Sequence, residues 1–141
     1  MKIVALVQAR MGSSRLPGKV MKSVAGMPMI EVLLHRLSRS ELIDEIVVAT
    51  STDDGNRDLV LHVKSLGYAY FQGDERDVLN RYVEAAEASN ADVVVRITGD
   101  CPLVDARLVD SVIKHFNASG ADYVCNVLPP TYPDGLDIEV F

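Results

Sequence analysis

The sequence predicts an α/β protein with an open, doubly wound, mostly parallel sheet. Nearly unbroken apolar runs, rich in β-branched residues, alternate along the chain with stretches whose apolar residues recur at helical spacing. Such runs are typical of parallel strands that are covered on both faces. The 141 residues match the size of one domain, and no internal repeat or linker divides them. We therefore expect a single domain over residues 1–141.

Five apolar runs are the expected strands. The strongest are residues 3–7, 46–49 and 93–97, a weaker run at 68–71 fits an edge strand, and 123–125 fits a fifth strand. If the order across the sheet is 68–71, 46–49, 3–7 and 93–97, the last two strands are neighbours where the strand order reverses. The loops that follow them then share one crevice at the carboxyl edge of the sheet, where folds of this class bind ligands.

Four stretches with helical spacing of apolar residues are the expected helices. Pro28 suits the first turn of the first helix. Asp105 is an expected N-cap, and Gly120 an expected C-terminal signal, of the last helix. The helical stretches are residues 30–37, 59–66, 78–86 and 108–116.

The charge distribution indicates an anionic ligand. The net charge of −6 argues against non-specific binding of nucleic acid. Residues 1–30 nevertheless contain five Lys or Arg and no acid, whereas the rest of the chain carries −11. A positive segment set against a negative body favours a local anion such as phosphate, and the alternative is a solvated basic loop.

Membrane and redox signals are weak. No apolar run approaches the ~20 residues that span a bilayer, and the N-terminus shows no cleavage site. Cys101 and Cys125 lack the spacing of zinc or redox pairs. We therefore expect a cytoplasmic protein with no membrane partner and with both thiols reduced.

The loop after the first strand, residues 8–20, has the composition of a phosphate-binding loop. Its glycines allow close approach of the backbone, its serine hydroxyls can donate to phosphate oxygens, and its cations supply positive charge. The residues concerned are Ala9, Arg10, Gly12, Ser13, Ser14, Arg15 and Lys19.

Two better-known phosphate loops do not fit this segment. A Walker loop has one residue fewer between its glycines than the interval from Gly12 to Gly18, and it places Ser or Thr where Val20 follows Lys19. The dinucleotide-binding pattern G-x-G-x-x-G is also missing from the sequence.

Four stretches together carry a family resemblance: residues 8–19, 73–82, 96–105 and 132–140. They resemble, in the same order, those of the cytidylyltransferases that activate acidic sugars, the family of CMP-Kdo and CMP-sialate synthetases. Within it, the closer resemblance is to the spore coat polysaccharide biosynthesis protein F group. The resemblance implies a Rossmann-like nucleotidyltransferase fold, also described as a nucleotide-diphospho-sugar transferase fold. It also implies CTP and a sugar acceptor as substrates and Mg²⁺ as cofactor.

The resemblance also implies roles for single residues. The backbone at Ala9 and Arg10 would face the base. Arg76 and Arg81, on either side of a helix start, would reach the base or the ribose, with a surface pair as the alternative. We choose Lys19 and Arg15 as the catalytic cations, because a sugar oxygen that attacks the α-phosphorus expels pyrophosphate and charge must be neutralised on both groups. The remaining phosphate-binding positions are Arg10, Gly12, Ser13 and Ser14.

Acidic residues supply the expected metal site. The resemblance places a catalytic, magnesium-binding aspartate at Asp100, and a turn-forming role is the alternative. The chain closes with Asp134, Asp137 and Glu139. The last two would share one face of an extended segment and contact sugar hydroxyls or metal, or else lie on a solvated edge strand. Cys101 is expected to be buried, and the three histidines form no common cluster and receive no function.

Taken together, the residues and the resemblance predict a magnesium-dependent cytidylyltransferase in cell-surface polysaccharide synthesis, with CTP preferred to GTP. Family members are usually longer, so the chain is expected to be a nucleotide-binding domain that lacks a C-terminal part for sugar binding and for a homodimer. Two alternatives remain open at this point. One is a glycosyltransferase that uses a nucleotide-sugar donor, and the other is a nucleotide-binding module without catalysis.

Overall fold

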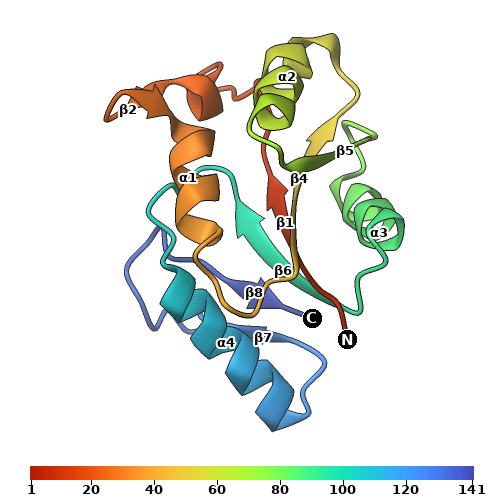
Figure 1. Cartoon of the computed structure of the whole chain (residues 1–141), viewed down its shortest axis with the longest axis vertical. Coiled ribbons are helices and arrows are strands. Elements are labelled where there is room, and N and C mark those ends of the chain that lie inside the picture. Colours follow the sequence, from red (N-terminus) through yellow and green to blue (C-terminus); the bar gives the residue numbers. More distant parts are fainter.

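A six-stranded sheet lies at the centre of the computed structural model, which describes residues 1–141 (Figure 1). The first four strands across it run parallel, in the order expected from the sequence. A separate hairpin joins β2 (Ser23–Val24) and β3 (Met27–Pro28). The order across the main sheet is β5 (Ala69–Gly73), β4 (Glu45–Ser51), β1 (Ile3–Gln8), β6 (Val93–Thr98), β8 (Glu139–Val140) and β7 (Val124–Cys125).

The position of the short strand β8 rules out one sequence-based interpretation, a solvated edge strand at Asp137 and Glu139. This strand runs antiparallel to both β6 and β7 and lies between them, so it is not an edge strand. Ile138 and Val140 are fully buried, whereas Glu139 lies on the other face of the strand and is partly exposed. The alternation of acidic and apolar residues therefore places one face of an interior strand in the core.

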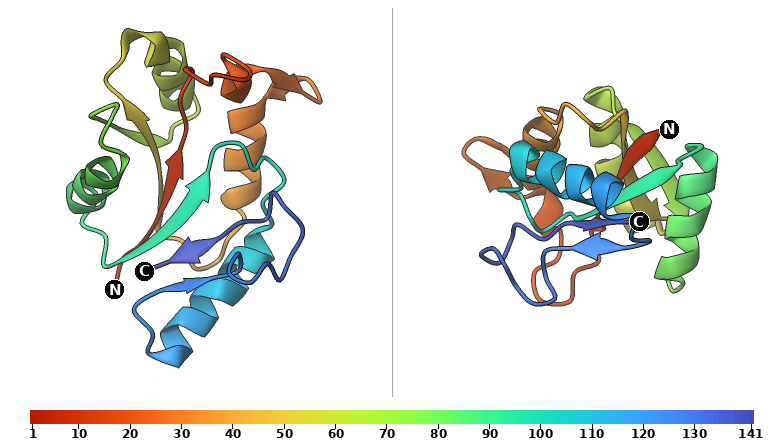
Figure 2. Two further views of the ribbon diagram at one scale, coloured as in Figure 1. Left: turned by 180° about the vertical axis from the view of Figure 1, so that it is seen from behind. Right: turned by 90° about the horizontal axis from the view of Figure 1, so that it is seen from below.

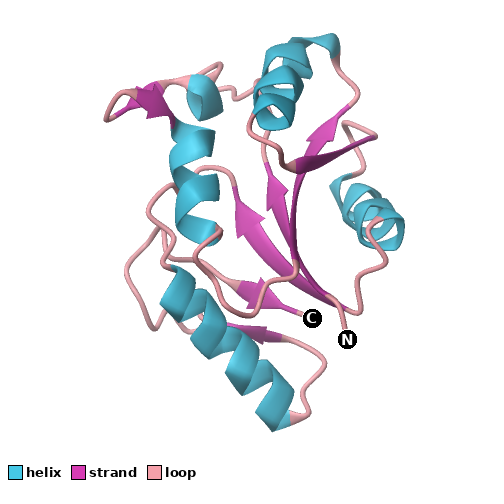
Figure 3. Ribbon diagram, in the orientation of Figure 1, coloured by secondary structure: helices cyan, strands magenta, loops and turns pink.

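Helices cover both faces of the sheet, as a doubly wound fold requires (Figures 2 and 3). The buried residues of three helices pack on one face with Ala5 and Val7 of β1. Tyr82 and Ala85 of the remaining helix, α3, pack on the opposite face with Val4 and Leu6. None of the helices could cross a membrane. They are α1 (Met29–Leu37), α2 (Arg57–Ser65), α3 (Val78–Ala88) and α4 (Ala106–Ser119), and two 3₁₀ turns, η1 (Lys19–Met21) and η2 (Asp54–Asn56), precede α1 and α2.

The ends of α4 follow the predicted signals. The carboxylate of Asp105 accepts hydrogen bonds from the backbone N–H groups of Arg107 and Leu108, which completes an N-cap. Gly120 ends the helix in the left-handed conformation, with φ of 66°. Both local predictions for this helix are confirmed.

Two of the three histidines share a carboxylate, a contact that the sequence did not predict, although the three form no common cluster. Glu31 of α1 contacts Nε2 of His62 in α2 at 2.9 Å and Nε2 of His35 at 3.4 Å. His35 lies one helical turn after Glu31, but His62 is 31 residues away and reaches it only through the packing of α2 beside α1. The cluster links α1 to α2 and includes no residue of the predicted phosphate loop.

Candidate functional site

The loops after β1 and β6 enclose a hollow of about 270 Å³ at the carboxyl edge of the sheet. The parallel register pairs Gln8 with Thr98, so both strands end at the same level and their loops face each other. The crevice expected from the strand order is therefore present. The residues that line it are Gln8, Ala9, Arg10, Ser13, Ser14, Arg15, Lys19, Val20, Thr98, Gly99 and Asp100.

Gly99 allows the two loops to approach each other this closely. Its N–H donates a hydrogen bond of 2.7 Å to the carbonyl oxygen of Gln8. A Cβ atom at this position would lie 2.7 Å from that oxygen and 2.9 Å from Cβ of Ala9, which is closer than real Cβ contacts. The missing side chain thus brings Asp100, the next residue, against the loop after β1.

Asp100 and Lys19 face each other across the hollow. Oδ2 of Asp100 lies 3.6 Å from Nζ of Lys19, and the two side chains are 55% and 35% exposed. Partial burial raises the pKa of Asp100, but the hydrogen bond from the Thr98 side chain and the charge of Lys19 outweigh burial and hold that pKa below its ordinary value. The structure therefore presents an ionised carboxylate that solvent and ligands can reach.

The segment from residue 9 to residue 19, here called the phosphate loop, is closed by its own backbone. The carbonyl oxygen of Met11 accepts hydrogen bonds from the N–H groups of Ser13 at 2.9 Å and Gly18 at 2.8 Å. Gly18 has φ of 70°, a conformation that favours glycine. Val20 is buried directly after the loop and anchors it to the core.

Positive charge dominates the hollow. Arg10 and Arg15 are exposed and form no ion pair with any carboxylate of the chain. With Lys19, three cations therefore face one carboxylate, that of Asp100. Unpaired cations around a cluster of hydroxyl and backbone N–H donors form a suitable environment for a polyanion such as a triphosphate.

A sequence model described as cytidylyltransferase matches residues 4–132. The chain belongs to the cytidylyltransferase family. The match includes the phosphate loop and Asp100, so the family resemblance seen in the sequence is confirmed at the level of the family.

Individual relatives of the chain agree with it in fold. A cytidylyltransferase from Leptospira borgpetersenii is 35% identical and superimposes with a TM-score of 0.94 over 100% of this chain and 60% of its own. A CMP:2-keto-3-deoxy-manno-octonic acid synthetase, solved in complex with CTP, is 28% identical, with a TM-score of 0.75 over 86% of this chain and 49% of its own. These likenesses confirm the predicted fold class.

Relatives in sequence are longer proteins. The spore coat polysaccharide biosynthesis protein SpsF of Bacillus subtilis is 38% identical over 125 residues, which cover 86% of this chain and 52% of that protein. The chain spans about half the length of the curated relatives that it matches.

Three predicted positions lie outside the hollow. Gly12 is exposed and is not among the lining residues. Arg76 lies in the exposed loop after β5, two strands away from β1, and its N–H is bonded to Asp74. Its contact with a base or ribose therefore stays a prediction. Arg81 is 1% exposed and donates to the carbonyl oxygen of Asp74, so the interpretation as a surface pair is wrong for Arg81.

The three late acidic residues have different surroundings. Burial raises the pKa of the Cys101 thiol, and the charges of Asp100 and Asp137 raise it further. Sγ of Cys101 lies 3.8 Å from Oδ1 of Asp100. Glu139 instead pairs with Arg96, and Asp134 is exposed in the preceding loop. Cys101 forms no disulfide and is 5% exposed, and its Sγ lies 3.1 Å from Oγ1 of Thr98, so the expectation of a buried cysteine is confirmed.

No cluster of three or more His, Cys, Asp or Glu side chains is placed to hold a metal ion by itself. Asp100 offers an ionised and accessible carboxylate, and the charge of Asp137 also acts on the neighbouring Cys101 thiol. Mg²⁺ is usually held by one or two carboxylates together with substrate phosphates and water. The donor set at the end of β6 fits such an ion.

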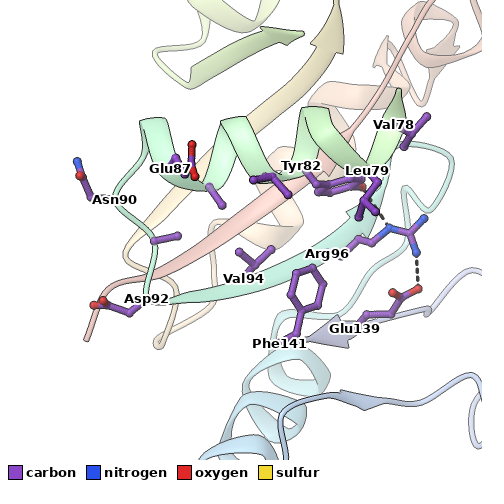
Figure 4. Close-up of a pocket in the computed structure, with 13 residues that line it drawn as sticks. Val78, Leu79, Tyr82, Glu87, Asn90, Asp92, Val94, Arg96, Glu139 and Phe141 are labelled. Carbon is purple, nitrogen blue, oxygen red and sulfur yellow. Dashed lines mark hydrogen bonds and ion pairs between the residues drawn. The ribbon is translucent and has the colours of Figure 1, made fainter. Parts of the chain in front are cut away.

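A larger hollow of about 910 Å³ lies between α3 and the strands β6 and β8 (Figure 4). Leu79, Val94 and Phe141 give it a largely apolar lining. Its one arginine, Arg96, is paired with Glu139, and Arg96 Nε donates to the hydroxyl oxygen of Tyr82 at 3.3 Å. Because this charge is already neutralised, the larger hollow is less suited to a triphosphate than the phosphate loop.

Proposed function

We propose that the chain binds CTP in the hollow between the phosphate loop and Asp100, and that it transfers CMP to a sugar with release of pyrophosphate. The observation that carries this proposal is that three cations, Arg10, Arg15 and Lys19, line the same hollow as the ionised carboxylate of Asp100. Membership of the cytidylyltransferase family supports the nucleotide, as does the CTP complex of the related synthetase.

In this proposal the cations act on the reacting phosphates. An oxygen of the acceptor sugar forms a bond to the α-phosphorus while the bond from that phosphorus to the pyrophosphate breaks. Lys19 and Arg15 neutralise charge on the α-phosphoryl group and on the departing pyrophosphate, while Ser13, Ser14 and the loop backbone hold the other oxygens. Arg10 adds positive charge at the rim.

Asp100, with Asp137 as a second candidate, would hold Mg²⁺ in this site. The ion would neutralise phosphate charge when bound. The side chain of Asp100 contributes an oxygen on the face that Lys19 also approaches, so the cation of the lysine and the ion would act on neighbouring phosphate oxygens.

The acceptor is proposed to be an acidic sugar of a cell-surface polysaccharide. Two relatives support this class by their names, a spore coat polysaccharide biosynthesis protein and a synthetase of the CMP derivative of an octonic acid. The identity of the sugar is part of the proposal.

Titration calorimetry with the four nucleoside triphosphates, with and without Mg²⁺, tests the proposal. CTP should bind more tightly than GTP, and Mg²⁺ should strengthen binding. Lys19→Ala and Arg15→Ala should each weaken CTP binding by roughly 1.5–3 kcal/mol, or about one to two decades in dissociation constant. Arg39→Ala is the matched control, because Arg39 is an exposed cation outside the hollow.

Each contrary outcome has a definite meaning. Unchanged affinity in Lys19→Ala and Arg15→Ala would remove the phosphate loop as the site. Tighter binding of GTP would favour a purine nucleotidyltransferase, and tighter binding of a nucleotide diphosphate sugar would favour a glycosyltransferase. Binding of CTP without release of pyrophosphate in the presence of acidic sugars would leave a non-catalytic module.

A further inference from the structure

The phosphate loop is joined to the rest of the molecule by very few hydrogen bonds. Between residues 10 and 18, the only hydrogen bond to another part of the chain runs from the N–H of Met11 to Oδ1 of Asn56, at 2.8 Å. Asn56 lies 45 residues further along the chain, at the end of η2. The two ends of the loop are held by the bond from Ala9 to Ala49 and by buried Val20, whereas its middle is hydrogen-bonded to the rest of the chain only through Asn56.

The side chain of Asn56 is itself held in one orientation. It is 3% exposed, and its Nδ2 donates to Oγ of Ser51 at 2.7 Å and to the carbonyl oxygen of Ser51 at 3.3 Å. Ser51 is the last residue of β4, which pairs directly with β1. Since both ends of the amide have partners, Oδ1 points at Met11 with little freedom.

The bond to Met11 acts at the point where the loop closes. The same residue whose N–H is held by Asn56 accepts the two backbone bonds, from Ser13 and Gly18, that form the loop. Fixing Met11 therefore fixes a closed unit that carries Ser13, Ser14 and Arg15. Without Asn56 the loop keeps its internal bonds and the bond from the N–H of Ala9 to the carbonyl oxygen of Ala49, but Met11 loses its attachment through Asn56 to the last residue of β4.

We propose that Asn56, oriented by Ser51, is a positioning residue that holds the phosphate loop in the conformation that binds the triphosphate. The inference rests on the proposed function and extends it to residues that touch no nucleotide. Loss of the attachment lets the loop populate other conformations, and the apparent affinity falls in proportion to the competent fraction.

Affinity for CTP is measured in Asn56→Ala, Ser51→Ala and the control Asp44→Ala. The carboxylate of Asp44 accepts a bond of 2.7 Å from the N–H of Ile3, at the opposite end of β1. Asn56→Ala should weaken CTP binding about tenfold if only about a tenth of the loop population stays competent. Ser51→Ala should weaken it less, in the same direction, and Asp44→Ala should lower the melting temperature while leaving affinity unchanged. The proposal would be overturned if Asn56→Ala lowered the melting temperature as much as Asp44→Ala does and left the affinity for CTP unchanged.

Amide hydrogen exchange tests the loop without any nucleotide. The N–H groups of Met11, Ser13 and Gly18 should exchange faster in Asn56→Ala, while those of β1 keep their protection. Unchanged exchange at Ser13 and Gly18 would overturn the positioning role even if affinity falls. If the wild type binds no CTP, the proposed function fails, and exchange still decides the role of Asn56. If Asn56→Ala does not fold, CTP affinity and amide hydrogen exchange are both measured on Ser51→Ala instead.

Discussion

The pKa values of two neighbouring residues after β6, Asp100 and Cys101, are shifted in opposite directions by their surroundings. The thiol of Cys101 is buried, which raises its pKa and makes it a poor nucleophile. Asp100, one residue earlier, is half exposed beside Lys19 and has a lowered pKa despite partial burial. One side chain therefore packs, whereas the other stays charged and available to a ligand.

The lowered pKa of Asp100 leads to a prediction about pH. Its carboxylate is ionised at all pH values above its ordinary pKa of 3.8. Its contribution to stability is therefore present above that value and is lost only as the pH falls through the lower, folded-state pKa. Consequently the ratio of CTP affinities of the wild type and Asp100→Asn, both with Mg²⁺, should stay constant from about pH 7 to about pH 5. Calorimetry at several pH values measures this ratio, and a ratio that shrinks over this range would contradict the prediction.

At the scale of the element, one strand end and one helix end depend on backbone positions that favour glycine. Gly99 is confined by the end of β1, whereas Gly120 is unconfined but has a left-handed backbone at the end of α4. The first restriction is steric and the second is conformational. A methyl group should therefore be costly at both positions for different reasons.

Three glycine substitutions separate these effects in urea unfolding. Gly99→Ala should cost about 1–3 kcal/mol or more, because the methyl group meets backbone that cannot move aside. Gly120→Ala should cost about 1–2 kcal/mol from the left-handed conformation alone. Gly12→Ala is the control, since its Cβ would meet nothing within 4 Å and its φ is not positive, and its effect should stay within about 0.5 kcal/mol. A Gly99→Ala variant as stable as the control would contradict the close contact of the two loops.

At the scale of the whole molecule, the two faces of the sheet are covered unequally. Buried side chains of α1, α2 and α4 pack on one face, and α3 alone packs on the other. Beside α3 the apolar hollow of Figure 4 remains accessible. Leu79 on its rim is 76% exposed, whereas Leu34 of α1 is fully buried on the opposite face.

The unequal cover predicts unequal costs for the same substitution. Leu34→Ala should destabilise the fold by about 2–5 kcal/mol, because it leaves a cavity in the core. Leu79→Ala should change stability by no more than about 0.5 kcal/mol. Chemical unfolding of both variants measures the difference. A large cost for Leu79→Ala would mean that the hollow is covered in solution.

Much of the fold followed from local sequence patterns. The apolar runs predicted the four main strands, the helical spacing predicted four helices, and Asp105 and Gly120 predicted the ends of α4; the strand order considered for a doubly wound sheet is the one observed. The predicted site residues line the hollow, except for Gly12 and Arg76, and the choice of Asp100 among them rested on the family resemblance. These features depend on residues close together in sequence, or on the rule that parallel strands end at one edge.

Contacts between distant segments could not be predicted in this way. The place of β8 inside the sheet, the burial of Arg81 and the meeting of His35 and His62 at Glu31 each depend on packing between separate elements. Asn56 offered only a weak signal, an asparagine in a turn after a strand, because its partner Met11 is 45 residues away.

The sequence by itself determined the chemistry of the site, because the phosphate loop and Asp100 carry their charges and hydroxyl groups wherever the chain places them. The tertiary structure decided which of these groups act together. It brought Lys19 within 3.6 Å of Asp100 and attached the phosphate loop to Asn56, while it directed Glu139 to Arg96 instead. The physical reason is that register, burial and the missing side chain of Gly99 set the distances between segments that the sequence lists far apart.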